Sequence, residues 1–213
     1  MAQKSPKKHP LASRRRRQLG FVFIVVLSIV VLAQRLGYFG PLPAGDHSRY
    51  HDRKFTVIKV VDGDTIDIDI PDLQTGKAYT RVRLWGVDTP ETKHPDQDAM
   101  YYGLEAAEFT RRATLNRQVT INLEPFQRPR DYYGRLLAYI YLPDGKMLNE
   151  QLITQGFAYA DHRFDHILRR NFLQLQKNAQ RKKQGLWQNV RPDQWPLWYR
   201  RRHDPNYQQK NSN

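Results

Sequence analysis

The chain has 213 residues, of which 39% are hydrophobic, so it has room for one ordinary domain with extensions. It contains no cysteine, which excludes disulfides and thiolate metal sites. The formal net charge of +14 comes from the two ends, because residues 51–180 hold as many acidic as basic residues. The charge total therefore gives no argument that the central part binds a polyanion.

Residues 1–18 form a basic tail, with seven Lys or Arg and no acidic residue. The apolar run that follows is uncharged up to Ala33, which predicts a transmembrane anchor or a signal segment over residues 19–39. Cleavage stays an alternative, because Val31 and Ala33 are small residues at the positions that a signal peptidase reads. Since basic residues before the segment favour a cytoplasmic N-terminus, the rest of the chain is expected outside the cytoplasm, held at the membrane or secreted.

Residues 40–54 are rich in Gly, Pro and polar residues and are predicted to be a linker. The folded domain is expected over residues 55–187. Residues 188–213 would then form a basic and aromatic C-terminal extension, with docking of Trp187 and Trp195 onto the barrel favoured over contacts with bases or lipid.

Short runs rich in β-branched and aromatic residues predict five strands, at residues 55–61, 65–70, 79–87, 118–123 and 136–142. Apolar residues at helical spacing predict three helices, at residues 102–113, 147–155 and 167–179. This order of elements lacks a parallel βαβ repeat. It predicts an α+β fold, a five-stranded Greek-key OB-fold barrel with about three packed helices, preceded by one N-terminal hydrophobic helix.

Charged residues gather where the predicted strands end, which is where a barrel presents its functional loops. The segment VDGDT contains Asp62 and Asp64, and on its own it is typical of a hairpin turn. The segment RVRLWGVDTPETKHP brings Arg83, Asp88 and Glu91 together around a Thr-Pro step. Acids and a guanidinium so close in sequence are harder to explain as surface decoration.

The segment RPRDYYGRLLAYIY places Arg135 at the start of an apolar strand, where alone it is equally compatible with a solvated strand end. Together, VDGDT, RLWGVDTPETKHP, YGLEAAEFT, DYYGRLLAYIY and DGKMLNEQLITQG resemble the staphylococcal nuclease (thermonuclease) family, in the same order. The resemblance implies a calcium-dependent endonuclease on an OB-type barrel. Its substrates would be DNA and RNA, hydrolysed to 3′-phosphate products.

The resemblance also implies roles for particular residues. Asp64 and Asp88 match the family's calcium carboxylates, and Thr89 matches the residue that lends its backbone carbonyl; all are the oxygen ligands that calcium prefers. Glu91 matches the proposed general base.

Arg83 and Arg135 match the arginines that hold the scissile phosphate and stabilise its developing charge. Tyr133 matches a tyrosine of the nucleotide pocket. His162 and Phe164 depart from the family, because they stand where it carries two further nucleotide-contacting tyrosines.

One alternative is a catalytically inactive OB-fold module that binds nucleic acid or protein and is tethered to a membrane. The complete set of matched carboxylates and arginines argues against it, since a binding module does not need them together. Besides nucleic acid and the membrane, the sequence indicates no partner.

Overall fold

The structure is a computed structural model that describes residues 20–29, 32, 45–92, 99–125, 127–204 and 207. Contacts divide the chain into two units, residues 1–44 and residues 45–213. In the first unit, residues 20–29 are helical with exposed side chains. Throughout the described residues, no helix is both long and apolar enough to cross a membrane. The tail and most of the segment predicted as an anchor lie outside the described residues, so the anchor stays a prediction.

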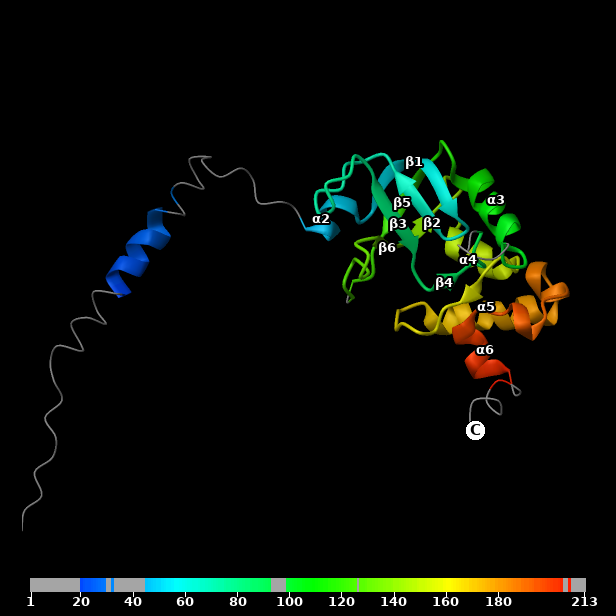
Figure 1. The fold of residues 1–213 in the computed structure, drawn as a ribbon. Helices are drawn as coiled ribbons and strands as arrows, with labels where there is room; N and C mark the ends of the chain where they lie inside the picture. Colours follow the sequence, from blue (N-terminus) through cyan, green and yellow to red (C-terminus); the bar gives the residue numbers. More distant parts are fainter. Residues whose placement is uncertain are drawn as a thin grey trace, which may run out of the picture. The chain divides into compact units, whose positions relative to one another are not determined.

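Five strands close into a barrel, which confirms the predicted α+β fold class (Figure 1). The strands are β1 (Arg53–Asp62), β2 (Thr65–Ile68), β3 (Thr80–Leu84), β5 (Gln118–Asn122) and β6 (Leu136–Tyr141). Around the barrel the order is β1-β2-β3-β6-β5. All neighbours are antiparallel except β3 and β6, which run parallel.

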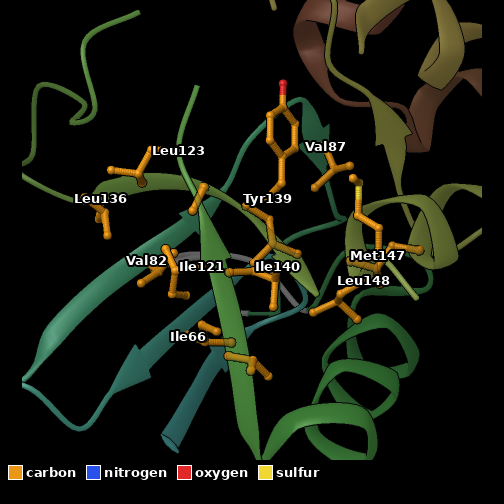
Figure 2. Close-up of a cluster of buried hydrophobic side chains, with 14 of the residues drawn as sticks. Ile66, Val82, Val87, Ile121, Leu123, Leu136, Tyr139, Ile140, Met147 and Leu148 are labelled. Carbon is orange, nitrogen blue, oxygen red and sulfur yellow. The ribbon is translucent and has the colours of Figure 1, made fainter. Parts of the chain in front are cut away.

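The barrel interior is filled by branched aliphatic side chains. Ile66, Val82, Ile121 and Ile140 come from four different strands, are fully buried and lie inside the barrel in Figure 2. In β3, alternate residues are fully buried, as expected for a strand with one face on the core. Each fully buried side chain of this size contributes about 2 kcal/mol of hydrophobic stabilisation, so the barrel is a rigid support for the loops at its rim.

The predicted strand over residues 79–87 is wrong as a single strand, because the chain bends at Trp85 and Gly86. Gly86 has a φ of +73°, and a Cβ there would lie 2.5 Å from the ring of His166. The Trp85 carbonyl accepts a hydrogen bond of 2.9 Å from the Asn149 side chain, which fixes the bend. Beyond it, β4 (Val87–Asp88) pairs with β7 (Tyr159–Ala160) outside the barrel. The bend therefore sets the position of Asp88.

The predicted linker is wrong from residue 45 onward, while residues 40–44 lie outside the described part. Helix α2 (Asp46–Tyr50) precedes β1, and the fully buried Tyr50 shares a hydrogen bond of 3.0 Å with the Thr80 hydroxyl. Both carboxylate oxygens of Asp46 bind the Arg130 guanidinium, at 2.8 and 2.9 Å, and Arg130 also pairs with Asp72 at 2.7 Å. The folded domain therefore begins ten residues before the predicted start at residue 55.

The remaining helices are α3 (Gly103–Thr114), α4 (Leu148–Thr154), α5 (Arg169–Arg181), the 3-10 helices η1 (Gly185–Gln188) and η2 (Pro192–Gln194), and α6 (Leu197–His203). The C-terminal extension folds onto the domain through a second apolar cluster. Its buried centre is Tyr159, Leu186 and Tyr199. Trp187 and Trp195 pack against this centre, Trp187 on Tyr159 of β7 and Trp195 on Tyr199 of α6. The predicted docking onto the barrel itself is therefore wrong, because both rings lie in this second cluster beside it.

Candidate active site

The tip of the β1–β2 hairpin carries Asp64. The predicted turn is present, with Asp62 opposite Thr65 and the Asp62 carboxylate accepting a hydrogen bond from the Asp64 backbone N–H at 3.1 Å. Gly63 is required for packing, because a Cβ there would lie 2.7 Å from the Thr89 hydroxyl oxygen. This close approach lets the Thr89 backbone N–H donate to Asp64 Oδ2 at 2.8 Å. The hairpin tip is thereby joined to the segment after β4.

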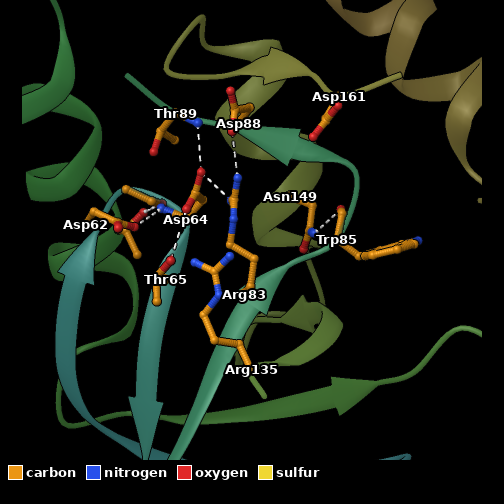
Figure 3. Close-up of polar contacts among 12 residues, drawn as sticks. Asp62, Asp64, Thr65, Arg83, Trp85, Asp88, Thr89, Arg135, Asn149 and Asp161 are labelled. Carbon is orange, nitrogen blue, oxygen red and sulfur yellow. Dashed lines mark hydrogen bonds and ion pairs between the residues drawn. The ribbon is translucent and has the colours of Figure 1, made fainter. Parts of the chain in front are cut away.

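Arg83 connects the two carboxylates that the sequence predicts as metal ligands. It lies on β3 opposite Thr65, so its side chain reaches the rim beside the hairpin. Its Nη1 pairs with Asp64 Oδ2, and its Nη2 lies 2.7 Å from Asp88 Oδ1 (Figure 3). One buried guanidinium therefore holds together acids from two separate turns.

Burial disfavours the charged forms of Asp64 and Asp88, and Arg83 offsets this effect only in part. Burial raises the pKa of Asp64 to about 6 in spite of Arg83, and the negative charge of Asp62 adds to the effect. The pKa of Asp88 is raised by burial as well, with a further contribution from Asp64. A second cation between the carboxylates would relieve this cost.

The donor atoms fit a hard divalent cation such as calcium. Calcium takes carboxylate, main-chain carbonyl and water oxygens, and Asp64, Asp88 and the adjacent carbonyl of Thr89 supply the first two kinds. In the described part of the chain, no group of three His, Cys, Asp or Glu side chains could hold a metal ion. An ion at this site would therefore complete its shell with the carbonyl and with water.

Arg135 reaches the same site from the start of β6. Its Nε donates to Asp131 Oδ2 at 2.7 Å, and its guanidinium lies over the ring of Tyr133, 5.5 Å from the centroid. In Figure 3 the side chains of Arg83 and Arg135 extend toward the same region of the rim. Tyr133 is 78% exposed, so its ring is free to stack with a ligand.

A cavity of about 800 Å³ collects the predicted residues. Its walls include six of the seven predicted site residues, namely Asp64, Arg83, Asp88, Glu91, Tyr133 and Arg135. Thr89 is buried, donates its backbone N–H to Asp64 and is not part of the wall. The wall holds both arginines and carboxylates. The arginines suit a phosphate group, and the carboxylates suit a cation bound beside it.

Glu91 is exposed at this cavity, yet its pKa is raised. Desolvation by neighbouring atoms is the largest cause, followed by repulsion from Asp64 and Asp88, while the arginines act in the opposite direction. A carboxylate that binds protons more tightly than usual is a better general base.

Sequence reasoning missed several residues of the site. Arg163 pairs with Asp161 at 2.7 Å and lies 3.2 Å from Asp88 Oδ1, and both Asp161 and Arg163 line the cavity. Trp198 donates its indole N–H to Asp88 Oδ2 at 2.8 Å. The charged run DHRFD was the available signal for the first two. No local pattern indicated Trp198, which lies 110 residues beyond Asp88.

The two positions that depart from the family behave differently. Phe164 lines the cavity, is 54% exposed and lies 5.9 Å from Trp85 between ring centroids. His162 faces Trp198 instead, at 5.0 Å between ring centroids, and is not part of the cavity wall. The cavity therefore keeps an aromatic wall, although not the one that two tyrosines would make.

A closed OB-type barrel that presents guanidinium groups and carboxylates in one open cavity has the groups that bind a phosphate ester and stabilise the charge that develops on it. Residues 81–189 match the family described as "Staphylococcal nuclease homologue". The chain is 38% identical to a protein named "Thermonuclease" from Staphylococcus hyicus over 172 residues, which cover 80% of this chain and 96% of that protein.

A "Thermonuclease" from Staphylococcus intermedius is 35% identical over 79% of this chain and 96% of its own length. An "Uncharacterized endonuclease" from Escherichia coli is 34% identical over 68% of this chain and 84% of its own length. The chain belongs to the staphylococcal nuclease family, and as an enzyme it is a hydrolase of the nuclease class.

Proposed function

We propose that this chain is a calcium-dependent nuclease that hydrolyses phosphodiester bonds of DNA and RNA and leaves 3′-phosphate products. The observation that supports it best is the single cavity on which Asp64, Asp88, Glu91 and both arginines converge. The similarity to proteins named thermonuclease supports the reaction class. The oxygen donors of the site support a hard cation such as calcium.

In the proposed reaction, a water molecule attacks the phosphorus, the bond to the 5′ oxygen breaks, and the departing 5′ oxygen takes up a proton from solvent. Glu91 accepts the proton of the attacking water, for which its raised pKa is suited. Arg83 and Arg135 neutralise the charge that builds on the phosphate oxygens, and their planar guanidinium forks match two oxygens at once. Calcium, when bound by Asp64, Asp88 and the Thr89 carbonyl, would add positive charge next to the same phosphate.

The substrate would enter along the exposed aromatic side of the cavity. Tyr133 and Phe164 offer faces on which a base can stack, and such stacking tolerates any base. Stacking without base-edge hydrogen bonds is consistent with action on both DNA and RNA.

The test is a cleavage assay of the full chain on single-stranded DNA and on RNA, with calcium or with a chelator. We expect cleavage with calcium, loss of cleavage in chelator, and 3′-phosphate ends in the products. Glu91→Gln should lower turnover by about 10²-fold to 10⁴-fold. The matched control is Glu105→Gln, an exposed position on α3 outside the cavity, which should cleave normally.

Full activity in chelator would remove the proposed metal role of Asp64 and Asp88. Binding of nucleic acid without any cleavage would favour the alternative of an inactive module.

We also propose that residues 19–39 hold the nuclease domain at the outer side of the membrane. The reason is the charge asymmetry around that segment, because basic residues before it favour a cytoplasmic N-terminus. Membrane fractionation with N-terminal sequencing is the measurement. An anchored protein should keep Met1 or Ala2, whereas a soluble form beginning at Gln34 would indicate a cleaved signal peptide. A domain protected from protease in intact spheroplasts would contradict the location altogether.

A further inference from the structure

We infer that Trp198, in the C-terminal extension, is a positioning residue that orients Asp88 for the metal. The inference rests on the proposed function, because it takes Asp88 as a calcium ligand. It concerns a part of the chain that follows the family match, which ends at residue 189.

The Asp88 carboxylate is held at both oxygens. Trp198 Nε1–H donates to Oδ2 at 2.8 Å, while Arg83 and Arg163 approach Oδ1 at 2.7 and 3.2 Å. Donors on the two oxygens fix the plane of the carboxylate, which otherwise rotates over a broad range. The orientation of a proposed metal ligand thus depends on a side chain far along the sequence.

Trp198 is itself held firmly. Its ring lies under the Arg163 guanidinium, 4.7 Å from the ring centroid, and 5.0 Å from the ring of His162. The next residue, Tyr199, is buried and accepts a hydrogen bond of 3.0 Å from Gln180 on α5. Helix α6 is thereby fastened to the domain beside the site.

The extension also packs on the element that pairs with Asp88. Tyr159 lies opposite Asp88 in the β4–β7 pair, and its ring contacts those of Trp198 and Tyr199, at 6.4 and 4.9 Å between centroids. The strand that carries Asp88 is therefore supported both through its partner strand and directly through the indole N–H.

An indole N–H suits this task chemically. It is a neutral donor, so it orients the carboxylate without adding a positive charge that would repel a metal ion. Arg163 does carry a positive charge, but Asp161, which it binds at 2.7 Å, compensates it. Removing a hydrogen-bond partner of a metal ligand commonly lowers metal affinity by about 10-fold to 100-fold. Loss of the Trp198 N–H should therefore weaken calcium binding measurably.

The experiment compares Trp198→Phe with Trp195→Phe in the full chain. Phe keeps an aromatic ring and removes only the N–H. Trp195 is the matched control, because it packs on Tyr199 in the same extension but its Nε1 has no hydrogen-bond partner among the described residues. Calcium affinity is measured by calorimetry, and the calcium concentration for half-maximal cleavage is measured separately.

We expect Trp198→Phe to bind calcium about 10-fold more weakly and to need correspondingly more calcium for cleavage, with the rate largely recovered at saturating calcium. Trp195→Phe should resemble the wild type. Equal behaviour of the two variants, whether both weakened or both normal, would overturn the inference, since the N–H would then have no specific effect.

A second measurement needs no variant. In full chain labelled with 15N-tryptophan, the Trp198 indole resonance should shift on calcium addition more than that of Trp195, and an unshifted Trp198 signal would overturn the inference. If the wild type itself binds no calcium, the proposed function fails. If it binds calcium and the variants do not differ, the positioning role alone fails.

Discussion

Arg83 and Arg135 are matched to the same task but lie in different surroundings. Arg83 is largely buried between Asp64 and Asp88, so its removal would leave the buried Asp64 and the largely buried Asp88 without their cation. Breaking a buried ion pair in this way typically costs about 3 kcal/mol or more, so lost activity could reflect lost structure. Arg135 pairs with Asp131 at the edge of the cavity, where its side chain is 29% exposed. It is therefore the better probe of transition-state stabilisation.

The first prediction is that Arg135→Ala lowers turnover by about 10²-fold or more, as expected when one donor to a developing negative charge is removed. The free energy of unfolding should fall by no more than about 1 kcal/mol, because a partly exposed ion pair contributes little. Steady-state cleavage rates and urea denaturation measure the two effects. Arg111→Ala, which breaks an exposed ion pair with Glu108 on α3, is the control and should cleave normally. Near-normal turnover in folded Arg135→Ala would contradict the assigned role.

At the scale of elements, the sequence was informative where the signal is local. The hairpin around Gly63 and the helices α3, α4 and α5 follow from turn residues and apolar spacing, and six of the predicted site residues line one cavity. These residues lie in short motifs at strand ends. Such a motif therefore indicates both where a site residue lies in the fold and which functional group it provides.

The misses arise from long-range contacts. The bend at Gly86 depends on Asn149, and the bond from Trp198 to Asp88 joins residues 110 positions apart, so nothing near Asp88 in the sequence signals either contact. Helix α2 was missed because five residues, Asp46–Tyr50, are too few to show an apolar period. Its helical form is stabilised by tertiary contacts with Arg130 and Thr80.

The second prediction concerns the ion cluster that fastens α2 to the barrel. Arg130 binds both Asp46 and Asp72, and all three side chains are largely buried. Arg130→Gln would leave two buried carboxylates without a cation, so the free energy of unfolding should fall by about 3 kcal/mol at neutral pH. Urea denaturation is the measurement, with Arg111→Gln as an exposed control. An unchanged free energy would show that the cluster does not stabilise the fold.

The pH dependence of this loss follows from Asp72. Burial acts to raise the pKa of Asp72, but hydrogen bonds from Arg130 and from the Gln74 backbone outweigh it, so the pKa lies below its ordinary value of 3.8. A depressed carboxyl pKa stabilises the fold above the ordinary value, and this stabilisation is lost as the pH falls through the lower, folded-state pKa. The difference between wild type and Arg130→Gln should therefore shrink below about pH 4.

For the whole molecule, the two ends of the folded unit lie outside the family match at residues 81–189. Before the match, α2 and the β1–β2 hairpin supply a core tyrosine and Asp64. After it, α6 supplies Trp198. The cavity wall itself runs from Asp62 to Phe164, and α6 supports it from outside through the bond to Asp88. The arginines of α6, Arg200 to Arg202, therefore belong to a folded part of the enzyme.

The last prediction tests where the folded unit begins, by comparing chains that start at residue 45 and at residue 55. The shorter chain lacks Tyr50, which is fully buried, and Asp46, which neutralises Arg130. It also loses the two strand residues that pair with β5 at Ile121 and Thr120. Removing a buried aromatic side chain alone costs about 3 kcal/mol or more.

The chain from residue 45 should therefore unfold at the same temperature as the full chain and cleave at the same rate. The chain from residue 55 should unfold at a clearly lower temperature, or fail to fold. Tyr50→Phe in the longer chain removes only the hydrogen bonds of the hydroxyl, to Thr80 and from Arg49, worth about 1 kcal/mol each. The further loss in Tyr50→Ala then measures the packing contribution of the ring. Equal melting temperatures for the two starting points would mean that α2 contributes nothing, and the domain would then begin where the sequence alone predicted.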